Sequence, residues 1–460
     1  MKNRFAICGT IVLLLLLSAC GAPQTLDFSY APEGEELSSL MVETSQTHRA
    51  ELEHVPSAAD FADAISDDPA SAGLLSESEV ESLLRGHAAM ETVSKEQAQS
   101  DVSLLFRTLQ SAYGAYEYFG QEKFDAAEDA VTQWLSSQDD EIKVSALGEK
   151  LQESLAFMLA HDAHAMIYEP AAEEIEAQVR YEYFFADGFY FSKDVNGSYY
   201  MVNDGERWTL SSFSDEHVSV QPTLLQDGRI VYQPTLFALR KDAVQSSVTL
   251  KNSSGKAKIY RLDWTESQPL DVDLGTLDYR LIQEDGLTYV SLRSFVSGTY
   301  DNMLARYARE GAKARGSKAV IYDLRGNVGG SDSWPRKWIQ SFLGTQNSIE
   351  TSMLYAQKNS ALFAAENSES LLPEDEGTCF AREVHGTWYE NDIPIIVLVD
   401  DHCGSSGEGA VQLLKTLDNV LIVGSNTAGY QLCGNISTFT LPYTCLLYTS
   451  PSPRDGLLSR

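Results

Sequence analysis

Two short stretches of the sequence carry the residue types that nucleophilic chemistry needs. Residues 323–331 (DLRGNVGGS) follow an apolar run and hold three glycines in five positions. Such a turn can bring backbone N–H groups close to a ligand, as an oxyanion hole requires. Residues 402–408 (HCGSSGE) place Ser405 between an apolar run and a helical pattern, where the helix dipole and free N–H groups stabilise developing negative charge. Ser405-x-x-Glu408 also fits a capping box, so a purely structural role for this serine is the alternative.

The sequence gives less support to a phosphate-binding loop, to an α/β hydrolase or to a metal site. No Gly-Lys-Ser/Thr follows the glycine-rich turn and its spacing is not GxGxxG, so a phosphate loop is disfavoured. The GxSxG elbow of the α/β hydrolases does not occur. Neither a zincin motif nor a Cys/His ligand spacing is present, so the sequence implies no metal and no other cofactor.

Composition narrows the class of protein. The chain has 460 residues, of which 43% are hydrophobic, and can bury a substantial core in two or three domains. A formal net charge of -32 at pH 7 opposes nucleic-acid binding. Of six cysteines, only Cys379, Cys403 and Cys433 lie away from the two ends. Three thiols make no disulfide framework, although one disulfide of unassigned pairing can form outside the cytosol.

The two ends of the chain have features of their own. Lys2, Arg4 and an apolar run over residues 11–17 resemble a secretion signal, and the run is too short to remain in a membrane as a span. Residues 17–20 (LSAC) resemble a bacterial lipobox, which predicts removal of a signal peptide over residues 1–20 and lipidation of Cys20, with an ordinary signal peptide as the alternative. Residues 445–460 begin CLLYTSPSPRD, a run that suits neither strand nor helix and looks like a translated sequencing adapter, with a disordered tail as the alternative. On the adapter interpretation, the native sequence stops near Thr444 and its closing segment is missing.

Between the ends, the pattern of apolar residues changes three times. Residues 21–97 have weak periodicity and indicate an acidic tether with a short helix or two. Residues 171–286 alternate apolar and polar positions between Asp-Gly and Asn-Gly turns, which predicts a β-rich region, with a degenerate PDZ-like module as one interpretation. Residues 287–444 alternate strands (288–292, 319–322, 395–399, 420–423) with helices (302–309, one after Ser333, 409–417), the pattern of an α/β layer structure. Residues 98–170 have a helical period that predicts an N-terminal helical domain with three core faces: Val102, Leu105, Phe106 and Leu109; Phe124, Ala127, Val131 and Leu135; Leu147, Leu151, Leu155 and Met158.

The order of these motifs resembles a family of serine peptidases that includes the tail-specific (C-terminal processing) proteases, the tricorn core and the modules of the retinoid-binding protein of the retina. The family pattern is a strand, DLRGNxGG, an apolar strand, a serine three positions before an acid, and GxxTxG ahead of LP. This sequence supplies residues 323–330, residues 395–399, Ser405 with Glu408, residues 424–429 (GSNTAG) and Leu441-Pro442 in that order. The resemblance covers about residues 287–443, and the helical region from residue 98 looks like the family's N-terminal domain. It implies an α/β fold with a ClpP/crotonase-like ββα spiral core.

The general base divides this family, and the sequence can be sorted by it. Processing proteases place a lysine directly after the TxG element, where this chain has Tyr430, and a phenol does not replace an amine of depressed pKa. Tricorn-like members take a histidine from a D-x-H sequence after the last N-terminal helix, where residues 162–164 (DAH) stand. The resemblance therefore implies His164 as the general base, with His161 as a neighbouring alternative. It also implies an acidic third residue beyond the LP element, in the segment that residues 445–460 replace.

By the same resemblance, Ser405 is the nucleophile, with Ser406 as its rival. The backbone N–H groups of Ser406 and of Gly329 or Gly330 would form the oxyanion hole. The implied function is a lipid-anchored serine endopeptidase of the cell envelope that hydrolyses exposed peptide or unfolded protein substrates and is weakened by the loss of a triad member. The alternative is a non-catalytic ligand- or peptide-binding lipoprotein on the same fold. The two differ in whether Ser405 and His164 converge to hydrogen-bond distance and in whether Ser405 reacts.

Overall fold

The computed structural model describes residues 36–86, 90–168, 181–203, 205–225, 227–239, 246–451 except 269, 272, 275, 299 and 435, and 456–458. The predicted signal sequence, the lipidation site Cys20 and residues 452–455 of the tail lie outside these ranges. The chain divides into two compact units, Met41–Tyr181 with Gln268–Arg460, and Glu182–Ser267 with Met1–Leu40. Ser405 and His164 both belong to the larger unit.

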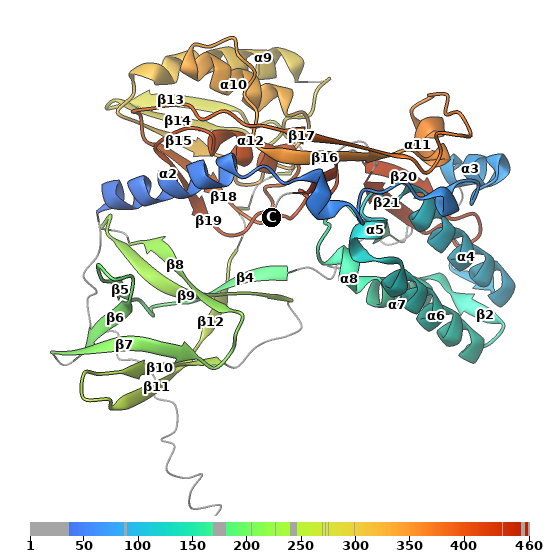
Figure 1. Ribbon diagram of the computed structural model, residues 1–460, viewed down its shortest axis with the longest axis horizontal. Coiled ribbons are helices and arrows are strands. Elements are labelled where there is room, and N and C mark those ends of the chain that lie inside the picture. The colour runs from blue at the N-terminus through green and yellow to red at the C-terminus, as the bar shows by residue number, and fades with distance from the viewer. Residues whose placement is uncertain are drawn as a thin grey trace, which may run out of the picture. The chain divides into compact units, whose positions relative to one another are not determined.

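A five-stranded sheet in the order β13-β14-β15-β18-β19 forms the α/β part of the larger unit (Figure 1). Its strands are β13 (Arg280–Glu284), β14 (Leu287–Ser291), β15 (Ala319–Asp323), β18 (Ile395–Val399) and β19 (Val420–Gly424). β13 pairs antiparallel with β14, and the other neighbours pair parallel. The last three strands are nearly continuous apolar runs, as parallel strands covered by helices usually are. The four strands predicted for this part are confirmed to within one residue at each end.

Three helices connect and cover these strands: α9 (Asp301–Glu310), α10 (Ser333–Leu343) and α12 (Ser406–Leu414). α9 and α10 lie side by side (Figure 1), and α10 also contacts α12. Their apolar faces share one core with the sheet, in which Tyr307 and Trp338 are completely buried. The predicted α/β layer pattern is therefore confirmed. α12 begins three residues before the predicted start at Gly409, because the chain turns into the helix directly after Ser405.

The parallel pairing brings the two candidate stretches to one edge of the sheet. In the register of the sheet, Asp323 at the end of β15 lies beside Leu398, and Val399 at the end of β18 lies beside Gly424. The glycine-rich residues 324–331, the turn 400–405 and the segment 425–431 all leave the sheet from this edge. Loops at the carboxyl ends of parallel strands are the usual place for a site in such sheets.

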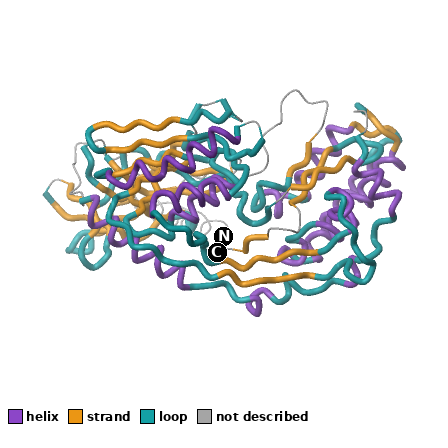
Figure 2. The backbone as a smooth tube through the Cα atoms, turned by 90° about the horizontal axis from the view of Figure 1, so that it is seen from above, coloured by secondary structure: helices purple, strands orange, loops and turns teal. Residues whose placement is uncertain are grey.

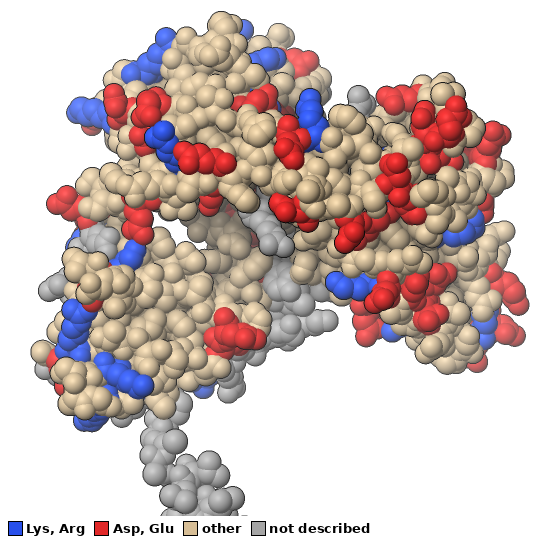
Figure 3. Space-filling view, viewed as in Figure 1, with Lys and Arg blue, Asp and Glu red and all other residues tan. Residues whose placement is uncertain are grey.

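The helical part of the larger unit contains α4 (Lys95–Ala112), α5 (Tyr116–Phe119), α6 (Gln121–Ser137), α7 (Val144–Ser154) and α8 (Ala156–Leu159). Every side chain predicted on the three core faces is buried, which confirms the helical period. Ser94 opens α4 with a capping box to Gln97. Figure 3 shows acidic side chains gathered over this part of the surface, where α6 alone carries Glu122, Asp125, Glu128 and Asp129.

Residues 36–86, expected as part of a tether, are folded onto the larger unit from Met41 onward. They contain α2 (Leu37–Glu53), the 3-10 turns η1 (Ala58–Phe61) and η2 (Pro69–Ser71), and α3 (Glu77–Leu84). α2 buries Met41, Ser45, His48 and Leu52 along one face, and the Ser45 hydroxyl accepts a hydrogen bond from the backbone N–H of Asn419 at 3.0 Å. Two of these four buried positions are polar, which explains why the sequence shows little apolar periodicity here.

A hairpin that the sequence did not predict extends from the α/β part toward the helices (Figures 1 and 2). Its strands are β16 (Met353–Lys358) and β17 (Cys379–Val384), with α11 (Ala361–Glu366) between them. At the helical end, the buried ammonium of Lys358 donates to the Glu117 carboxylate at 2.6 Å and to the Gln110 carbonyl at 2.9 Å. The short strand β22 (Gly456–Leu458) pairs with β16 on its other side.

The expectation that the run from Cys445 forms neither strand nor helix is wrong for its first half. β21 (Leu447–Pro451) pairs antiparallel with β20 (Ile436–Thr440) and with β3 (Met166–Tyr168). Leu446 and Tyr448 are buried in the core of the helical part. Their alternate spacing suits a strand with one buried face, and the proline stands only at its end.

The smaller unit consists of antiparallel strands in two sheets, β11-β10-β7-β6-β5 and β12-β4-β9-β8. Three of the predicted turn glycines, Gly188, Gly197 and Gly228, have φ of +71°, +80° and +87°, as tight hairpin turns require. The strands confirm the β-rich character of this region, and the PDZ-like interpretation stays a prediction. The strands are β4 (Tyr181–Ala186), β5 (Ser192–Lys193), β6 (Tyr199–Asn203), β7 (Glu206–Phe213), β8 (Val218–Leu224), β9 (Ile230–Leu239), β10 (Ser246–Lys251), β11 (Ala257–Leu262) and β12 (Trp264–Glu266).

None of the helices in the described part of the chain has both the length and the apolar character that a bilayer span requires.

Candidate active site

The glycine-rich loop is anchored at its base by a buried carboxylate. Asp323 is completely buried and accepts hydrogen bonds from Arg325 at 2.9 and 3.0 Å, from Arg293 at 3.2 Å and from the Tyr289 hydroxyl at 2.8 Å. Burial by itself raises the pKa of Asp323, but these donors outweigh it and hold the pKa well below its usual range. The carboxylate therefore stays ionised and fixes the point at which the loop leaves β15.

Two buried residues, Asn327 and Asp400, then join this loop to the turn that carries Ser405. Asn327 is completely buried; its amide donates to the Leu292 carbonyl at 3.0 Å, and its backbone carbonyl accepts from the N–H of Gly404 at 2.9 Å. Asp400, directly after β18, accepts from the backbone N–H of Gly326 at 2.8 Å. The two loops are thus held together by hydrogen bonds whose partners lie about 75 residues apart in the chain. Sequence reasoning placed Asn327 in a motif but assigned neither residue this role.

Ser405 lies at a sharp backbone turn and does not cap its helix. Its φ of 52° and ψ of -121° are unusual for a residue other than glycine. Its side chain accepts no capping hydrogen bond, so the capping-box interpretation is wrong. The hydroxyl is half-buried and hydrogen-bonds to no other described residue. A strained turn that presents a serine at the start of a helix is the geometry of an exposed nucleophile.

Gly329 packs directly against this serine. A Cβ atom at Gly329 would lie 2.6 Å from the Cβ of Ser405 and 3.0 Å from the backbone nitrogen of Ser406. Gly329 has a φ of +99°, which glycine adopts without strain. The glycine-rich loop and the serine turn therefore form one site, as their shared edge of the sheet predicts.

The backbone donors around Ser405 are not equivalent. The N–H of Gly329 already donates to the Asn327 side chain at 3.0 Å. Among the described residues, the N–H groups of Gly330 and Ser406 donate to no acceptor of the protein. The Ser406 side chain, the rival nucleophile, is 7% exposed at the start of α12.

Glu408, expected to complete a capping box, holds a different segment. Its carboxylate accepts from the backbone N–H groups of Gly429 at 2.8 Å and Tyr430 at 2.9 Å. Burial raises the pKa of this carboxyl, and the hydrogen bonds that it accepts oppose the rise. Glu408 thereby ties the segment 427–431 to the helix that begins beside Ser405.

That segment brings His164 into the neighbourhood of Ser405. The ring of Tyr430 meets the His164 ring edge to face, with centroids 4.4 Å apart, and the same ring would lie 2.7 Å from a Cβ at Gly404. The backbone N–H of Ala163 donates to the Gly429 carbonyl at 3.3 Å. His164 and the serine turn thus contact the same tyrosine. The structure places no hydrogen bond between the Ser405 hydroxyl and His164.

His164 is 3% exposed, and its Nδ1 lies 2.6 Å from the carbonyl oxygen of Cys433. Burial lowers the pKa of His164 to about 4, and the Cys433 carbonyl opposes this in part. The imidazole is therefore neutral at pH 7. His161, the alternative histidine, lies three residues earlier in the chain and is less buried than His164. Burial lowers the pKa of His161 as well, and the positive charge of Lys123 adds to this.

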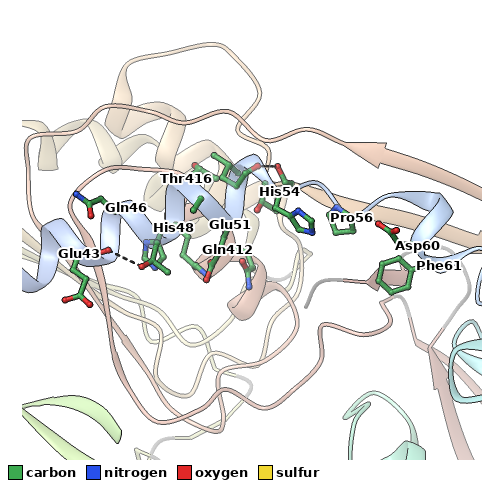
Figure 4. A pocket seen from close by; sticks show the side chains of 16 residues that line it. Glu43, Gln46, His48, Glu51, His54, Pro56, Asp60, Phe61, Gln412 and Thr416 are labelled. Carbon is green, nitrogen blue, oxygen red and sulfur yellow. Dashed lines mark hydrogen bonds and ion pairs between the residues drawn. The ribbon is translucent and has the colours of Figure 1, made fainter. Parts of the chain in front are cut away.

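A pocket of about 1120 Å³ lies away from these residues, beside the C-terminal end of α12. Figure 4 shows His48 and Glu51 of α2 among the side chains that line it, together with Gln412 and Thr416. None of the predicted site residues contributes to its wall.

The described cysteines Cys379, Cys403, Cys433 and Cys445 are all free thiols. Within the described ranges, no cluster of His, Cys, Asp and Glu side chains has the arrangement of a metal site.

Comparison with known proteins agrees with the position of this site. The model of peptidase family S41 matches residues 286–450, which include the glycine-rich loop and Ser405. A search of curated proteins finds no match. Among solved structures, mature CPAF aligns over 79% of this chain and 91% of its own at 12% identity and a TM-score of 0.40. A lipoprotein from Streptococcus agalactiae aligns over 80% and 87% at 14% identity and a TM-score of 0.30. At such identities and scores, these likenesses support neither a shared site nor a shared activity.

Proposed function

We propose that this chain is a serine peptidase of the S41 type that cleaves exposed peptides or unfolded proteins. One observation carries the proposal: Ser405 stands at a strained turn against Gly329, at the start of a helix and beside the unused N–H group of Ser406, within the segment that matches the S41 model. A nucleophile, a neutral imidazole and an oxyanion hole are the parts that acyl transfer needs. The same proposal includes two finer features that the sequence predicts. These are a ClpP/crotonase-like spiral core and the tricorn-like Ser-His branch of the family.

In the proposed reaction, the Ser405 hydroxyl attacks the carbonyl carbon of the scissile peptide bond while Nε2 of His164 takes its proton. The C–O bond to Ser405 forms, and the carbonyl electrons move to the oxygen. The N–H groups of Ser406 and Gly330 hold that oxyanion, at about 3 kcal/mol of transition-state stabilisation for each donor. His164 then gives its proton to the leaving amine as the C–N bond breaks, and water hydrolyses the acyl-enzyme by the same steps in reverse order.

Of the two glycines that the sequence offered, we assign the oxyanion donor to Gly330. The N–H of Gly329 is engaged by the Asn327 side chain at 3.0 Å, and a donor that already has a buried acceptor is a poor partner for a developing charge. Gly329 instead supplies the space that Ser405 needs.

The alternative, a non-catalytic binding protein on the same fold, is favoured by one observation. The Ser405 hydroxyl and His164 make no hydrogen bond, although a catalytic pair without substrate often has a long or poorly aligned contact. Fluorophosphonate labelling of the full-length protein distinguishes the two functions. A peptidase is labelled, and Ser405→Ala and His164→Ala lose the label while Ser406→Ala keeps it. An unlabelled but folded wild-type protein would leave the binding function.

The same proposal includes export and a lipid anchor at Cys20. Its support is the LSAC sequence after a charged and apolar N-terminus. The full-length protein expressed in a bacterium should fractionate with the envelope, and Cys20→Ser should release it into the soluble fraction. Equal envelope retention of both proteins would remove the lipid anchor from the proposal.

A further inference from the structure

The hydrogen bond at Nδ1 assigns the tautomer of His164. Nδ1 lies 2.6 Å from the carbonyl oxygen of Cys433, which can only accept a hydrogen bond. Nδ1 must therefore carry the proton. In the neutral ring, this leaves the lone pair on Nε2, which is the form that a general base requires.

A buried carboxyl holds both partners of that hydrogen bond. Asp162 is completely buried, and one of its oxygens accepts from the backbone N–H of His164 at 3.1 Å. The thiol of Cys433 lies beside Asp162, and each group shifts the pKa of the other. The second oxygen accepts from the hydroxyl of Tyr113 at 2.8 Å. The carboxyl does not touch the imidazole, but it fixes the backbone of the histidine and the side chain of the residue whose carbonyl orients it.

We propose that Asp162 is a positioning residue for the general base, and that through the backbone of His164 and the neighbouring thiol of Cys433 it keeps Nδ1 of His164 on the Cys433 carbonyl, so that the lone pair of the neutral ring stays on Nε2. The inference rests on the proposed function, because a base is needed only if Ser405 reacts. In the familiar triad, an acid touches the imidazole directly. Here the neutral carbonyl of Cys433 takes that position. The Asp162 carboxyl does not touch the ring and acts through the backbone of His164 and through Cys433.

The surroundings of the cluster determine how it responds to pH. Tyr113 follows α4, Tyr430 and Cys433 belong to the segment after β19, and Tyr448 lies on β21. Burial raises the pKa of Tyr113, Cys433 and Tyr448 well above their ordinary values, so these groups stay neutral. Burial also raises the pKa of Asp162 to about 6. The carboxyl is therefore the group of this cluster that changes charge just below neutral pH.

The test compares full-length Asp162→Asn with the wild type by two measurements. The first is the rate of fluorophosphonate labelling, and the second is the ¹⁵N shift of the His164 ring nitrogens, assigned by subtraction of His164→Ala. We expect labelling to fall by about 10- to 100-fold, since a base displaced by an ångström loses about 100-fold. We also expect the ring to change from one tautomer, protonated at Nδ1, to a mixture. In the wild type, the labelling rate should fall below about pH 6, and in Asp162→Asn that step should disappear.

Two further variants keep the test decisive. Thr108→Val removes a buried hydroxyl from α4 that donates to the Leu104 carbonyl at 2.7 Å, and it should label at the wild-type rate. If Asp162→Asn does not fold, Cys433→Ala removes the thiol but leaves the carbonyl, and it should show a smaller loss of rate with the same mixing of tautomers. Wild-type labelling with an unchanged tautomer in the folded Asp162 or Cys433 variant would overturn the inference. If the wild type is not labelled at all, the peptidase proposal fails, while the tautomer measurement still tests whether Asp162 orients the ring.

Discussion

Gly329 offers a sharp test of the site, because its neighbours leave no space for a side chain. In Gly329→Ala, the added Cβ would lie 2.6 Å from the Ser405 Cβ, 2.9 Å from the Gly404 carbonyl oxygen and 3.0 Å from the Ser406 nitrogen. Carbon atoms in contact prefer about 3.5–4.0 Å, so the glycine-rich loop and the serine turn must separate by roughly 1 Å. A displacement of that size costs on the order of 100-fold in rate.

The variant also has a cost in stability that must be separated from the clash. An alanine at φ +99° is strained by about 1–3 kcal/mol, whatever space surrounds it. Overpacking between the two loops adds about 1–3 kcal/mol. Gly298→Ala is the matched control, because Gly298 has a φ of +107° and nothing within 4 Å of its added Cβ.

The assay combines urea unfolding with the rate of fluorophosphonate labelling. Gly298→Ala should lose only the stability that the backbone strain accounts for and should label at the wild-type rate. Gly329→Ala should be less stable still and should label about 100-fold more slowly. The reasoning fails if Gly329→Ala labels as fast as Gly298→Ala, since the loop would then not control the position of the nucleophile.

Three further predictions concern the neighbours of the site. Gly404→Ala would place a Cβ 2.7 Å from the Tyr430 ring and should lower the free energy of unfolding by about 1–3 kcal/mol. Adding Tyr430→Ala should relieve the clash. If Gly404→Ala costs as much in the Tyr430→Ala background as in the wild type, the predicted clash is wrong. Asp323→Asn leaves the buried guanidinium of Arg293 without its anion and should cost about 3–5 kcal/mol in urea unfolding, whereas a loss below 1 kcal/mol would show that the pair is not needed. Asp162, whose pKa burial raises from 3.8 to about 6, binds its proton more tightly in the folded chain, so the free energy of unfolding should fall by on the order of 3 kcal/mol as pH rises from about 4 to 6. Asp162→Asn should remove that part of the slope, and an identical pH dependence in both proteins would refute the assignment.

The parts of the fold that the sequence predicts are those with a strong local pattern. The strands at 319–323 and 395–399 are apolar runs, and the core faces of α4, α6 and α7 repeat with the helical period. Residues 21–97 were expected to form a tether with a short helix or two, and the length and packing of α2 were not predicted because two of its buried positions, Ser45 and His48, are polar. The hairpin β16–β17 was not predicted because apolar and polar residue types do not alternate in its strand sequences, MLYAQK and CFAREV.

For the run from Cys445, the composition led to a wrong prediction of secondary structure. The Pro- and Ser-rich texture from Cys445 predicted no regular structure, yet Leu446 and Tyr448 are buried and Leu447–Pro451 forms a strand. Leu446 and Tyr448 are buried against the helical part, and Tyr448 and Thr449 are residue types that favour strands, whereas the serine and proline come only at the end of the strand. Tertiary packing of this kind cannot be read from a window of ten residues.

At the site, the sequence identifies the residues with reactive side chains but not what holds them. Ser405-x-x-Glu408 matches the capping-box template, because that template tests only residue type and spacing. The bonds that Glu408 makes instead go to Gly429 and Tyr430, 21 and 22 residues away. The partner of Nδ1 of His164 is a backbone carbonyl 269 residues away, and since every residue has a carbonyl, no residue type could have pointed to it.

Tyr430 connects these observations, because it occupies the position at which the processing proteases that the sequence resembles are expected to have a lysine base. Its ring contacts His164 and the backbone at Gly404, and its N–H donates to Glu408. A lysine ammonium in the same place would lie against the imidazole and lower a pKa that burial already holds at about 4. The phenol instead provides a neutral surface against which His164 packs, and Glu408 fixes that surface to the helix that begins beside Ser405.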